Sequence, residues 1–471
     1  MKRKGSSILF ALVLVLSFSV ATAVPVAGAT TWTVDDDGGK DFLSIAAAVA
    51  SASVLNGDTI EVYDGTYGKV VVSKELTIQA AVGDSPVVDG GGSGTCFGIY
   101  KAAGLDGVTI EGFEIRNATY GIWIYGAGAS LTTYDNITLC HNYIHDHSQN
   151  GILTTDATVN GLTISGNTIN DSGIGVSFSR AIVDGLTLDG NEVTNGNAGL
   201  AFFSGSYSNI EVSSCRFEGN AWEHIDLGAW GNWPSLSSVY ITGCQFLSGP
   251  CWCGVYVQST FSSGMDIVMN FNEFLTGQWG VYVDPAITTP VDARYNWWGD
   301  VSGPWNPWDT DGLNQHNPDG LGDIVSEYVL YDPWIGQEGM ATGGGWFIPE
   351  NSSRVGLTPD GKATFGFVAK QKNETSSGQL EFQYHADELN LKSTSYDWVS
   401  VASVQVMFEG EGVLNGVSGY RFRVWAFDGD KAGGQPDRFT IRVWTGSDSY
   451  ESPTYRAEGD IGGGQIVVHK K

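Results

Sequence analysis

Apolar and polar residues alternate in short stretches, and these stretches return at a regular interval through the middle of the chain. In VTIEGFEIRNATYGIWIY (108–125), three alternating runs rich in β-branched residues are separated by glycine and asparagine. Alternation with a period of two predicts strands, and Gly and Asn between the runs predict turns. The phrase begins again every 24 to 29 residues, at Val108, Ile137, Leu162, Leu186, Ile210, Val239 and Ile267. Such a repeat predicts a solenoid, in which three strands per coil stack coil upon coil around one continuous core.

Two columns of the repeat define its register. The residue seven positions after each start is large and apolar, which predicts that it points inward: Ile115, Ile144, Ile169, Val193, Phe217, Phe246 and Phe274. Five positions after the start, the residue is often asparagine, as at Asn142, Asn167, Asn191 and Asn272. Stacked amides can hydrogen-bond to the coils on both sides, so we expect an internal asparagine ladder at this turn.

These phrases resemble the right-handed parallel β-helix family, the pectin-lyase-like fold that also includes NosD-type repeats. The segment VDDDGGKDFLSIAAAVASASVLNGDTIEVYDGTY (34–67) resembles the entry of such helices, where a short amphipathic helix (about 43–54) caps the open end. ARYNWWGDVSGPWNPW (293–308) resembles the phrase with which many secreted β-helices close. The resemblance implies an all-β, right-handed, single-stranded parallel β-helix over residues 30–336, and it does not imply one activity.

A different pattern begins near Gly343 and continues to the end of the chain. Alternating runs such as KATFGFVAK, QLEFQYH, YRFRVWAFDG and DRFTIRVW are separated by turn signals at hairpin spacing. This pattern predicts a small antiparallel β-sandwich over residues 343–471. It resembles the β-domain appended to many secreted bacterial proteins, sometimes called the post-COAP domain. That resemblance leaves the domain's role open, and we expect one in attachment or assembly.

The N-terminus predicts export. MKRKGSSILFALVLVLSFSVATA has a basic start, an apolar run and a small-residue end, as in a secretory signal peptide, which we place at residues 1–29. No later segment is apolar over enough residues to span a membrane. The net charge of −28, with only 24 Lys and Arg, argues against nucleic acid as a partner, because basic side chains bind phosphate. We therefore expect a secreted, extracellular protein, free or associated with a cell surface.

The chain has six cysteines, an even number that suits an oxidising compartment. Cys215 and Cys244 fall in the asparagine column of neighbouring coils. Adjacent strands lie about 4.8 Å apart, which is within reach of a disulfide. We expect this pair either to be bridged or to stack as buried thiols within the ladder.

The catalytic phrases of the well-marked enzymes of this fold do not occur in the sequence. Pectate lyases of this fold use a basic residue beside calcium, and this helix has few basic residues. The Asn-Thr-Asp, Gly-His-Gly and Arg-Ile-Lys phrases of polygalacturonases are absent, as are the characteristic phrases of pectin methylesterases. The resemblance therefore extends to the fold and stops short of an activity.

One coil carries extra residues rich in acids and aromatics, GNAWEHIDLGAWGNWPS (219–235). Glu223 could serve as an acid and Asp226 as a base or nucleophile, because glycosidases use two carboxyls about 5 to 9.5 Å apart. Aromatic faces can stack on sugar rings, and the predicted sugar contacts are Trp123, Trp222, His224, Trp230, Trp233, Trp252, Tyr256 and Tyr282. The competing interpretation is that the tryptophans cover a loop and the acids are only solvated.

Two other segments carry potential metal ligands. WDTDGLNQHNPDGLGD (308–323) offers oxygen ligands around flexible glycines, which suits Ca²⁺; the candidates are Asp309, Asp311, Asn314, Asp319 and Asp323. In HNYIHDHSQNG (141–151), His145 and His147 alternate, so on an extended strand they point the same way and could share a metal. Polar decoration of the turns is the competing interpretation of the histidines.

Three classes of function fit this sequence. The leading hypothesis is a secreted or cell-surface β-helix protein that binds a polysaccharide or cell-surface glycan, or that builds extracellular structure. The second is a polysaccharide hydrolase or lyase that uses Glu223 and Asp226. The third is self-assembly into a filament or surface layer, since the ends of a solenoid can stack.

Overall fold

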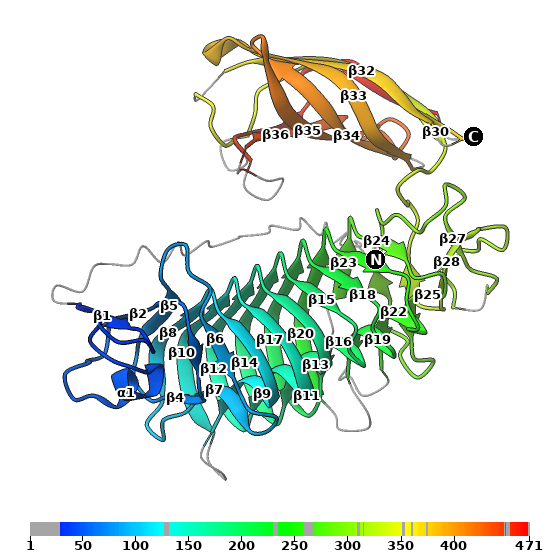
Figure 1. Ribbon diagram of the computed structural model, residues 1–471. Helices are drawn as coiled ribbons and strands as arrows, with labels where there is room; N and C mark the ends of the chain where they lie inside the picture. Colours follow the sequence, from blue (N-terminus) through cyan, green and yellow to red (C-terminus); the bar gives the residue numbers. More distant parts are fainter. Residues whose placement is uncertain are drawn as a thin grey trace, which may run out of the picture.

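The computed structural model describes residues 29–126, 131–228, 234–258, 267–308, 311–313, 315–350, 354–358, 361–373, 375–402, 404–446, 448 and 453–469. The predicted signal peptide thus lies outside the described residues, except for its last position. Figure 1 shows an elongated solenoid of stacked parallel strands followed by a separate curved antiparallel sheet. The predicted fold class is confirmed. In the parts of the chain that the structure describes, no helix is long and apolar enough to cross a membrane.

One side of the solenoid is a parallel sheet with one strand per coil. In spatial order it contains β1 (Thr31–Val34), β2 (Thr59–Val62), β5 (Thr77–Ala80), β8 (Leu105–Glu111), β10 (Thr132–Cys140), β12 (Ala157–Ser165), β14 (Ala181–Asp189), β17 (Gly205–Ser213), β20 (Pro234–Thr242), β23 (Ile267–Asn270), β26 (Val291–Asp292) and β29 (Val329–Leu330). The pairing is in register with the repeat, since Ile137 pairs with Val108 on one side and Leu162 on the other. The predicted repeat starts therefore form one column.

The other sides of each coil are formed by strands that also pair in parallel. They are β3 (Thr66–Tyr67), β4 (Val70–Val72), β6 (Val87–Asp89), β7 (Thr95–Ile99), β9 (Glu114–Tyr125), β11 (Tyr143–Thr155), β13 (Thr168–Ser179), β15 (Glu192–Thr194), β16 (Ala198–Phe202), β18 (Arg216–Glu218), β19 (Glu223–Leu227), β21 (Gln245–Leu247), β22 (Cys253–Val257), β24 (Glu273–Leu275), β25 (Trp279–Val283), β27 (Pro304–Trp305) and β28 (Gly322–Val325). The long strands β9, β11 and β13 each span the bend that is a break between two short strands in later coils.

The helix α1 (Ile45–Ala50) covers the N-terminal end of the solenoid, as predicted, although it is shorter than the predicted segment. The Ser44 hydroxyl accepts a hydrogen bond from the Ala47 amide at 3.2 Å and so caps the first turn. Its buried residues Ile45, Ala48 and Val49 join the solenoid core. Without this cap the edge of the first coil would expose its core to water.

The interior is continuous along the solenoid. All residues of the predicted seven-position column are buried, and in the later coils they stack as aromatic rings. Ring centroids lie 5.4 Å apart between Phe217 and Phe246, 4.8 Å between Phe246 and Phe274, and 4.6 Å between Phe274 and Trp298. The inward register predicted from the sequence is confirmed.

The asparagine ladder is also confirmed. The Asn167 side-chain oxygen accepts from the Asn142 amide at 3.0 Å, and its NH₂ group donates to the Leu139 carbonyl at 2.9 Å. The same NH₂ group donates to the Asn191 side chain in the next coil at 3.0 Å. Each asparagine thus satisfies buried polar groups of the neighbouring coils.

Cys215 and Cys244 interrupt this ladder as free thiols, and no disulfide joins them. Each thiol donates to a backbone carbonyl about one coil earlier in the chain, Cys215 to Leu188 and Cys244 to Val212, both at 3.6 Å. All six cysteines are buried and free. Of the two predicted arrangements for the pair, the structure has stacked thiols in the asparagine column.

The C-terminal domain is a nine-stranded antiparallel sheet. Its spatial order is β37 (Tyr455–Asp460), β36 (Arg438–Thr445), β35 (Val417–Phe427), β34 (Gln405–Leu414), β33 (Leu389–Val401), β32 (Thr375–Tyr384), β31 (Ala363–Lys372), β30 (Gly339–Phe347) and β38 (Gly463–His469). The predicted sandwich is one sheet that curls over its own core: Phe365 of β31 stacks on Phe439 of β36 at 4.0 Å, although four strands separate them in the sheet. Register shifts in the β33–β34 pairing supply local bends of the kind that let a sheet curl.

The curled sheet contacts the last coils of the solenoid. The Ser400 hydroxyl donates to the Trp334 carbonyl at 2.7 Å, and the Arg423 guanidinium lies 4.0 Å from the centre of the Phe271 ring. Gln405 hydrogen-bonds to the Tyr295 hydroxyl. The second domain is therefore attached near the C-terminal end of the solenoid, as Figure 1 shows.

Candidate functional site

The two predicted acids, Glu223 and Asp226, lie on one strand next to aromatic side chains. Both belong to β19, where Asp226 pairs with Ala201 of β16 and with Tyr256 of β22. Tyr256 in turn pairs with Tyr282 of β25. The Trp252 indole donates to Glu223 Oε1 at 2.7 Å. The structure thus brings together five of the candidate residues from the sequence: the two acids, Trp252, Tyr256 and Tyr282.

His224, between the two acids, has a different role from the one predicted. The equivalent positions in the neighbouring coils are Gly199 and Gly254, where the strand bends close to the core. Its imidazole fills the interior: the Asn220 NH₂ group lies 3.0 Å from Nδ1, and Nε2 lies 2.8 Å from the Leu247 carbonyl. Burial lowers the pKa of His224 to about 4. The predicted sugar contact is wrong, because this side chain is fully buried inside the solenoid.

The environment of Asp226 favours its protonated form. The residue is 1% exposed, and burial, with the nearby charge of Glu223, raises its pKa to about 7. The Gln258 NH₂ group opposes this shift by donating to both carboxyl oxygens, at 2.9 and 3.1 Å. Near neutral pH this carboxyl therefore exchanges its proton, which an ordinary surface aspartate does not.

Glu223 is held in a similar environment. Burial raises its pKa, and the hydrogen bond from Trp252 acts in the opposite direction. Its second oxygen, Oε2, is buried and accepts no hydrogen bond from any described residue. A buried carboxyl oxygen without a partner is costly unless a further group binds it. Burial therefore favours the protonated form of both acids.

Beside these acids, six aromatic residues form what we call the aromatic surface: Trp252, Tyr256, Trp279, Tyr282, Trp305 and Trp308. Trp252 packs edge-on against Tyr256 and Tyr282, with centroids 5.0 and 5.4 Å apart. Trp279 connects Tyr282, at 4.9 Å, to Trp308, on which it stacks at 5.5 Å. Trp305 follows at 5.9 Å from Trp308, and both Trp252 and Trp305 are 36% exposed. The surface extends from the two acids toward the end of the solenoid.

The remaining predicted aromatic contacts fall in three places. Trp222 is 38% exposed, and its carbonyl accepts from the Trp252 amide at 3.0 Å, so it lies beside the aromatic surface. Trp230 and Trp233 lie outside the described residues. Trp123 shares the column of Asp226 but lies four coils away, about 19 Å at about 4.8 Å per strand. There it joins a second aromatic cluster with Tyr120, at 5.0 Å, and Tyr125, at 4.5 Å.

The predicted calcium site is not formed by the acids that the structure describes. Asp323 is buried, and its carboxylate accepts from Thr276 and from the Gly277 amide. Asp311 accepts from the amides of Leu313 and Tyr328, both at 2.9 Å. Asp319 is exposed and makes no three-membered group of potential ligands with them. Asp311 and Asp323 thus fix turns, and Asp309 and Asn314 lie outside the described residues.

The predicted histidine pair is wrong. His147 points into the core, where Nε2 lies 3.1 Å from the Ile115 carbonyl, and burial lowers its pKa to about 4. His145 lies on the outside, stacked on Tyr143 at 4.3 Å and 3.3 Å from Glu114. Asp146 between them has a positive φ of 58°, so the strand does not alternate here. The two imidazoles therefore face opposite sides.

A polar groove that the sequence analysis did not predict lies on the outer face of β13, β15 and β18. It encloses about 480 Å³, and Tyr143, Asn170, Glu192 and Glu218 are among its lining residues. Arg216 bridges Glu192, at 3.3 Å, and Glu218. Its lining residues come from successive coils. The groove could be predicted only by comparing the outward-facing residues of neighbouring coils.

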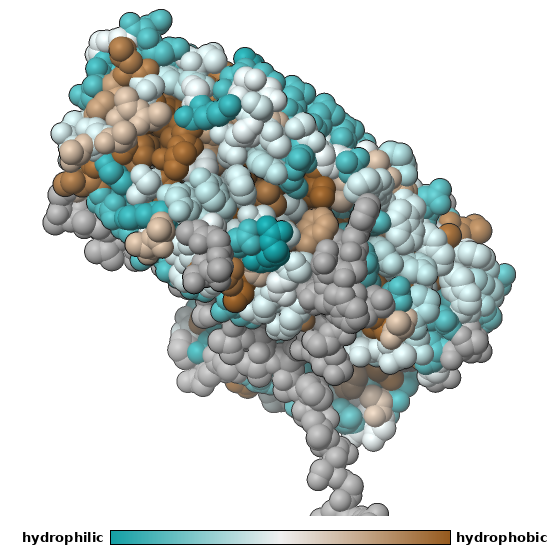
Figure 2. All heavy atoms as spheres, turned by 90° about the horizontal axis from the view of Figure 1, so that it is seen from below, coloured by the Kyte–Doolittle hydropathy of each residue, from teal (hydrophilic) through white to brown (hydrophobic). Residues whose placement is uncertain are grey.

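Apolar side chains gather elsewhere on the surface. The large exposed residues Leu43, Leu55, Val71 and Val82 all belong to the first coils. In the view from below, brown atoms gather toward the left end, where Figure 1 has these coils, and most of the remaining face is pale or teal (Figure 2). The apolar end is therefore distinct from the aromatic surface near β22 and β25.

Residues 60–260 match the family model described as "Right handed beta helix region". This region is a right-handed β-helix. Among solved structures, the chain is similar to an alginate lyase from Paenibacillus sp. str. FPU-7, with 15% identity, a TM-score of 0.43, and coverage of 64% of this chain and 99% of that one. Pectate lyase Pel9A is 12% identical with a TM-score of 0.37, and the match covers 64% of this chain and 80% of that one. Full-length tailspike protein 2 from Escherichia coli O157:H7 bacteriophage CAB120 is 10% identical with a TM-score of 0.38. That match covers 87% of this chain and 70% of that one. No curated protein matches the sequence.

Proposed function

We propose that the β-helix binds a polysaccharide along the aromatic surface, with Glu223 and Asp226 at one end of the site. The observation that carries this proposal is the continuity of the six aromatic rings beside two buried acids of raised pKa. Aromatic faces are apolar bodies on which the C–H face of a sugar ring can pack, and nearby carboxyls can accept from its hydroxyls. The partly exposed Trp252 and Trp305 are positioned to make the first contacts.

The orphaned oxygen of Glu223 supports a polar ligand at this end. If the side chains that cover Glu223 Oε2 move aside, a sugar hydroxyl could donate to this oxygen, which no described residue satisfies. Trp252, which donates to the other oxygen, orients the carboxyl. A solenoid presents equivalent positions in successive coils, so a polymer suits this site better than a single sugar.

Hydrolysis of the bound polysaccharide is a second function that the two carboxyls favour. Asp226 has a pKa of about 7. Once the side chains that bury it move aside, it is suited to donate its proton to the glycosidic oxygen as the bond to the anomeric carbon breaks. Glu223, once ionised, is suited to attack that carbon or to take a proton from the attacking water. Either route ends with water added across the bond, a new reducing end and both carboxyls returned to their starting states.

This function fits an extracellular protein. The basic, apolar and small-residue order of residues 1–29 favours secretion, and the acidic charge favours neutral or cationic glycans over polyanions. Self-association through the ends of the solenoid stays a prediction. Sedimentation of the mature protein at high concentration tests it, and a strict monomer would count against a filament.

The first experiment is a panel of polysaccharides incubated with the untagged mature protein. Retention in affinity electrophoresis measures binding, new reducing ends measure hydrolysis, and unsaturated products measure lyase action. Retention of at least one polysaccharide supports the binding site, and retention of none contradicts it. Reducing ends without unsaturated products support the hydrolytic role, and retention without turnover limits the site to binding.

If the panel yields turnover, we expect Asp226→Asn to lower it by at least about 100-fold, because loss of general acid catalysis costs roughly 100- to 10,000-fold. Glu223→Gln should act in the same direction. The control is Glu192→Gln, which removes an acid of the polar groove and leaves the candidate site intact. Turnover unchanged in Asp226→Asn would assign catalysis to other residues.

A further inference from the structure

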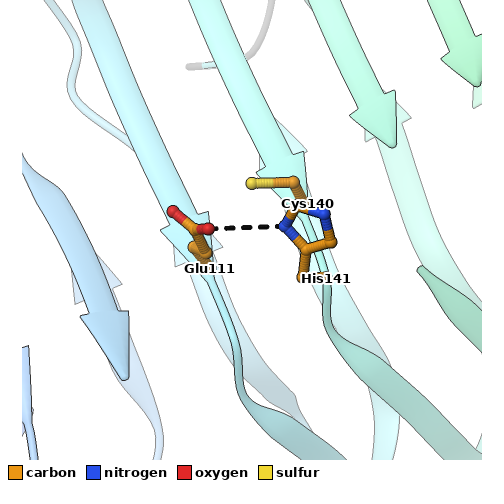
Figure 3. A group of neighbouring side chains, drawn as sticks. All are labelled: Glu111, Cys140 and His141. Carbon is orange, nitrogen blue, oxygen red and sulfur yellow. Dashed lines mark hydrogen bonds and ion pairs between the residues drawn. The ribbon is translucent and has the colours of Figure 1, made fainter. Parts of the chain in front are cut away.

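A second group of chemically active side chains lies on another side of the solenoid. Glu111 is the last residue of β8 and Cys140 the last residue of β10, and the two are cross-strand partners in adjacent coils. His141 follows Cys140 directly. One potential ligand atom from each of the three residues lies within 4.8 Å of the other two. The three side chains lie close together (Figure 3). Glu111 Oε1 lies 3.3 Å from His141 Nδ1.

His141 occupies a position where its neighbours are glycine. The turn requires a positive φ, which is 85° at Gly112, 55° at His141 and 62° at Gly166 in successive coils. A residue with a side chain pays roughly 1 to 2 kcal/mol in this conformation, and glycine does not. The histidine therefore lowers the local stability of the fold at a position where both adjacent coils have glycine.

The neighbouring coil also leaves room for the imidazole. A Cβ atom placed on Gly166 would lie 2.8 Å from His141 Cδ2, so the ring lies against the bare backbone of the next coil. The His141 amide donates to the Ser165 carbonyl at 3.0 Å, which fixes the turn that carries the ring. The imidazole lies beside Glu111 and remains largely exposed to solvent.

We propose that Glu111, Cys140 and His141 bind a divalent transition-metal ion of the Zn²⁺ class. Thiolate sulfur, imidazole nitrogen and carboxylate oxygen are the three ligand types that zinc accepts in proteins, and three protein ligands leave a fourth position for water. Thiolate and imidazole disfavour Ca²⁺ and Mg²⁺, which prefer oxygen ligands. This site is separate from the proposed polysaccharide site.

The distance between the carboxylate oxygen and the imidazole nitrogen suits this class of ion. Nitrogen and oxygen ligands at about 2.0 to 2.1 Å from a tetrahedral ion lie about 3.3 to 3.4 Å apart. The separation of Glu111 Oε1 and His141 Nδ1 already has this value. The side chains of His141 and Glu111 are 67% and 42% exposed, so an ion can reach them, and the buried Cys140 thiol is the third ligand of the group.

Binding includes the loss of one proton from the thiol. The ion forms a bond to Cys140 Sγ as the S–H proton passes to solvent, with no change in oxidation state. The carboxylate and the neutral imidazole bind through lone pairs. Metal affinity should therefore rise with pH, because the proton that leaves the thiol is a product of binding.

The test is a Co²⁺ titration of the untagged full chain, followed by displacement with Zn²⁺. We expect one equivalent of Co²⁺ to produce a thiolate-to-cobalt charge-transfer band that Zn²⁺ removes. Cys140→Ser should abolish that band. Cys96→Ser, a substitution of another buried free thiol, is the matched control and should leave it unchanged.

His141→Gly separates metal binding from folding, because glycine suits the conformation of this turn. Without metal, its melting temperature should equal or exceed that of the wild type. Its affinity for Co²⁺ should fall by about 100-fold or more, since loss of even an outer-shell partner costs roughly 10- to 100-fold. Wild-type affinity in His141→Gly, or no charge-transfer band in the wild type, would overturn the proposal and leave Glu111 and His141 as a surface ion pair.

Discussion

Asp226→Asn should stabilise the folded protein at pH 8 by up to about 4 kcal/mol. In the folded state the pKa of Asp226 is raised to about 7, whereas an unperturbed aspartate has a value of 3.8. Each pKa unit corresponds to 1.36 kcal/mol, so ionising this buried carboxyl costs about 4 kcal/mol relative to the unfolded chain. Asparagine has nearly the same shape and carries no charge, so the variant avoids that cost.

The direction of the pH dependence follows from the raised pKa. Between about pH 4 and pH 7 the folded state binds more protons at Asp226 than the unfolded state, so wild-type stability falls as the pH rises through this interval. Above pH 7 both states are ionised and the loss is complete. Below about pH 4 both states are protonated, and the difference between Asp226→Asn and the wild type should nearly vanish.

Urea unfolding at pH 4 and pH 8, followed by circular dichroism, measures this difference. The exposed substitution Asp319→Asn is the control and should change the free energy of unfolding by less than about 0.5 kcal/mol at either pH. A destabilised Asp226→Asn at pH 8 would mean that the ionised carboxyl is favoured in the fold, and the acid–base role proposed for it would lose its basis. Stabilisation by removal of a buried acid is the behaviour expected of a functional group.

Asn167→Leu should lower the free energy of unfolding by about 2 to 5 kcal/mol. The substitution removes the acceptor of the Asn142 amide and the donor to the Leu139 carbonyl, and both partners lie in the buried ladder. A buried polar group that loses its partner costs about 1 to 3 kcal/mol, and at least two groups are affected. Leucine has a similar volume, so the loss of hydrogen bonds dominates over any change in packing.

Asn160→Leu, on the exposed side of β12 in the same coil, is the control for this prediction. Its side chain donates to Asp135 at the surface, at 2.7 Å, so water can replace the lost contact. We expect a change of less than about 1 kcal/mol from this variant. Equal melting temperatures for Asn167→Leu and the wild type would contradict the inward register of the ladder.

The sequence predicted the solenoid well because its columns repeat. An inward residue such as Phe246 packs against equivalent residues in the adjacent coils. The pattern therefore recurs seven times with variation, and the seven repeats together define a register that a single repeat does not. The asparagine ladder was predictable for the same reason. The curl of the C-terminal sheet was not, because alternation marks strands and says nothing about how a single sheet folds over itself.

The candidate site was predicted only in part. Glu223, Asp226 and Trp252 were singled out by composition, yet their contacts depend on a bend that alternation does not reveal. At that bend His224 occupies a position that is glycine in the neighbouring coils, and its side chain points inward. A strict period of two would place this side chain on the surface. The Glu111–Cys140–His141 group was missed because Glu111 is 30 residues from His141 in sequence, and only stacking of the coils joins them.

The most direct test of the central claim is affinity electrophoresis of wild type, Trp252→Ala and Tyr240→Ala in the polysaccharide that the wild type retains best. Tyr240 is a partly exposed tyrosine of β20, on the sheet away from the aromatic surface, and is the matched control. We expect Trp252→Ala to weaken binding by about 10- to 30-fold, because a central aromatic anchor contributes about 1.5 to 2 kcal/mol, and Tyr240→Ala to bind as the wild type does. Wild-type affinity in Trp252→Ala would place the polysaccharide on another face of the β-helix and contradict the account.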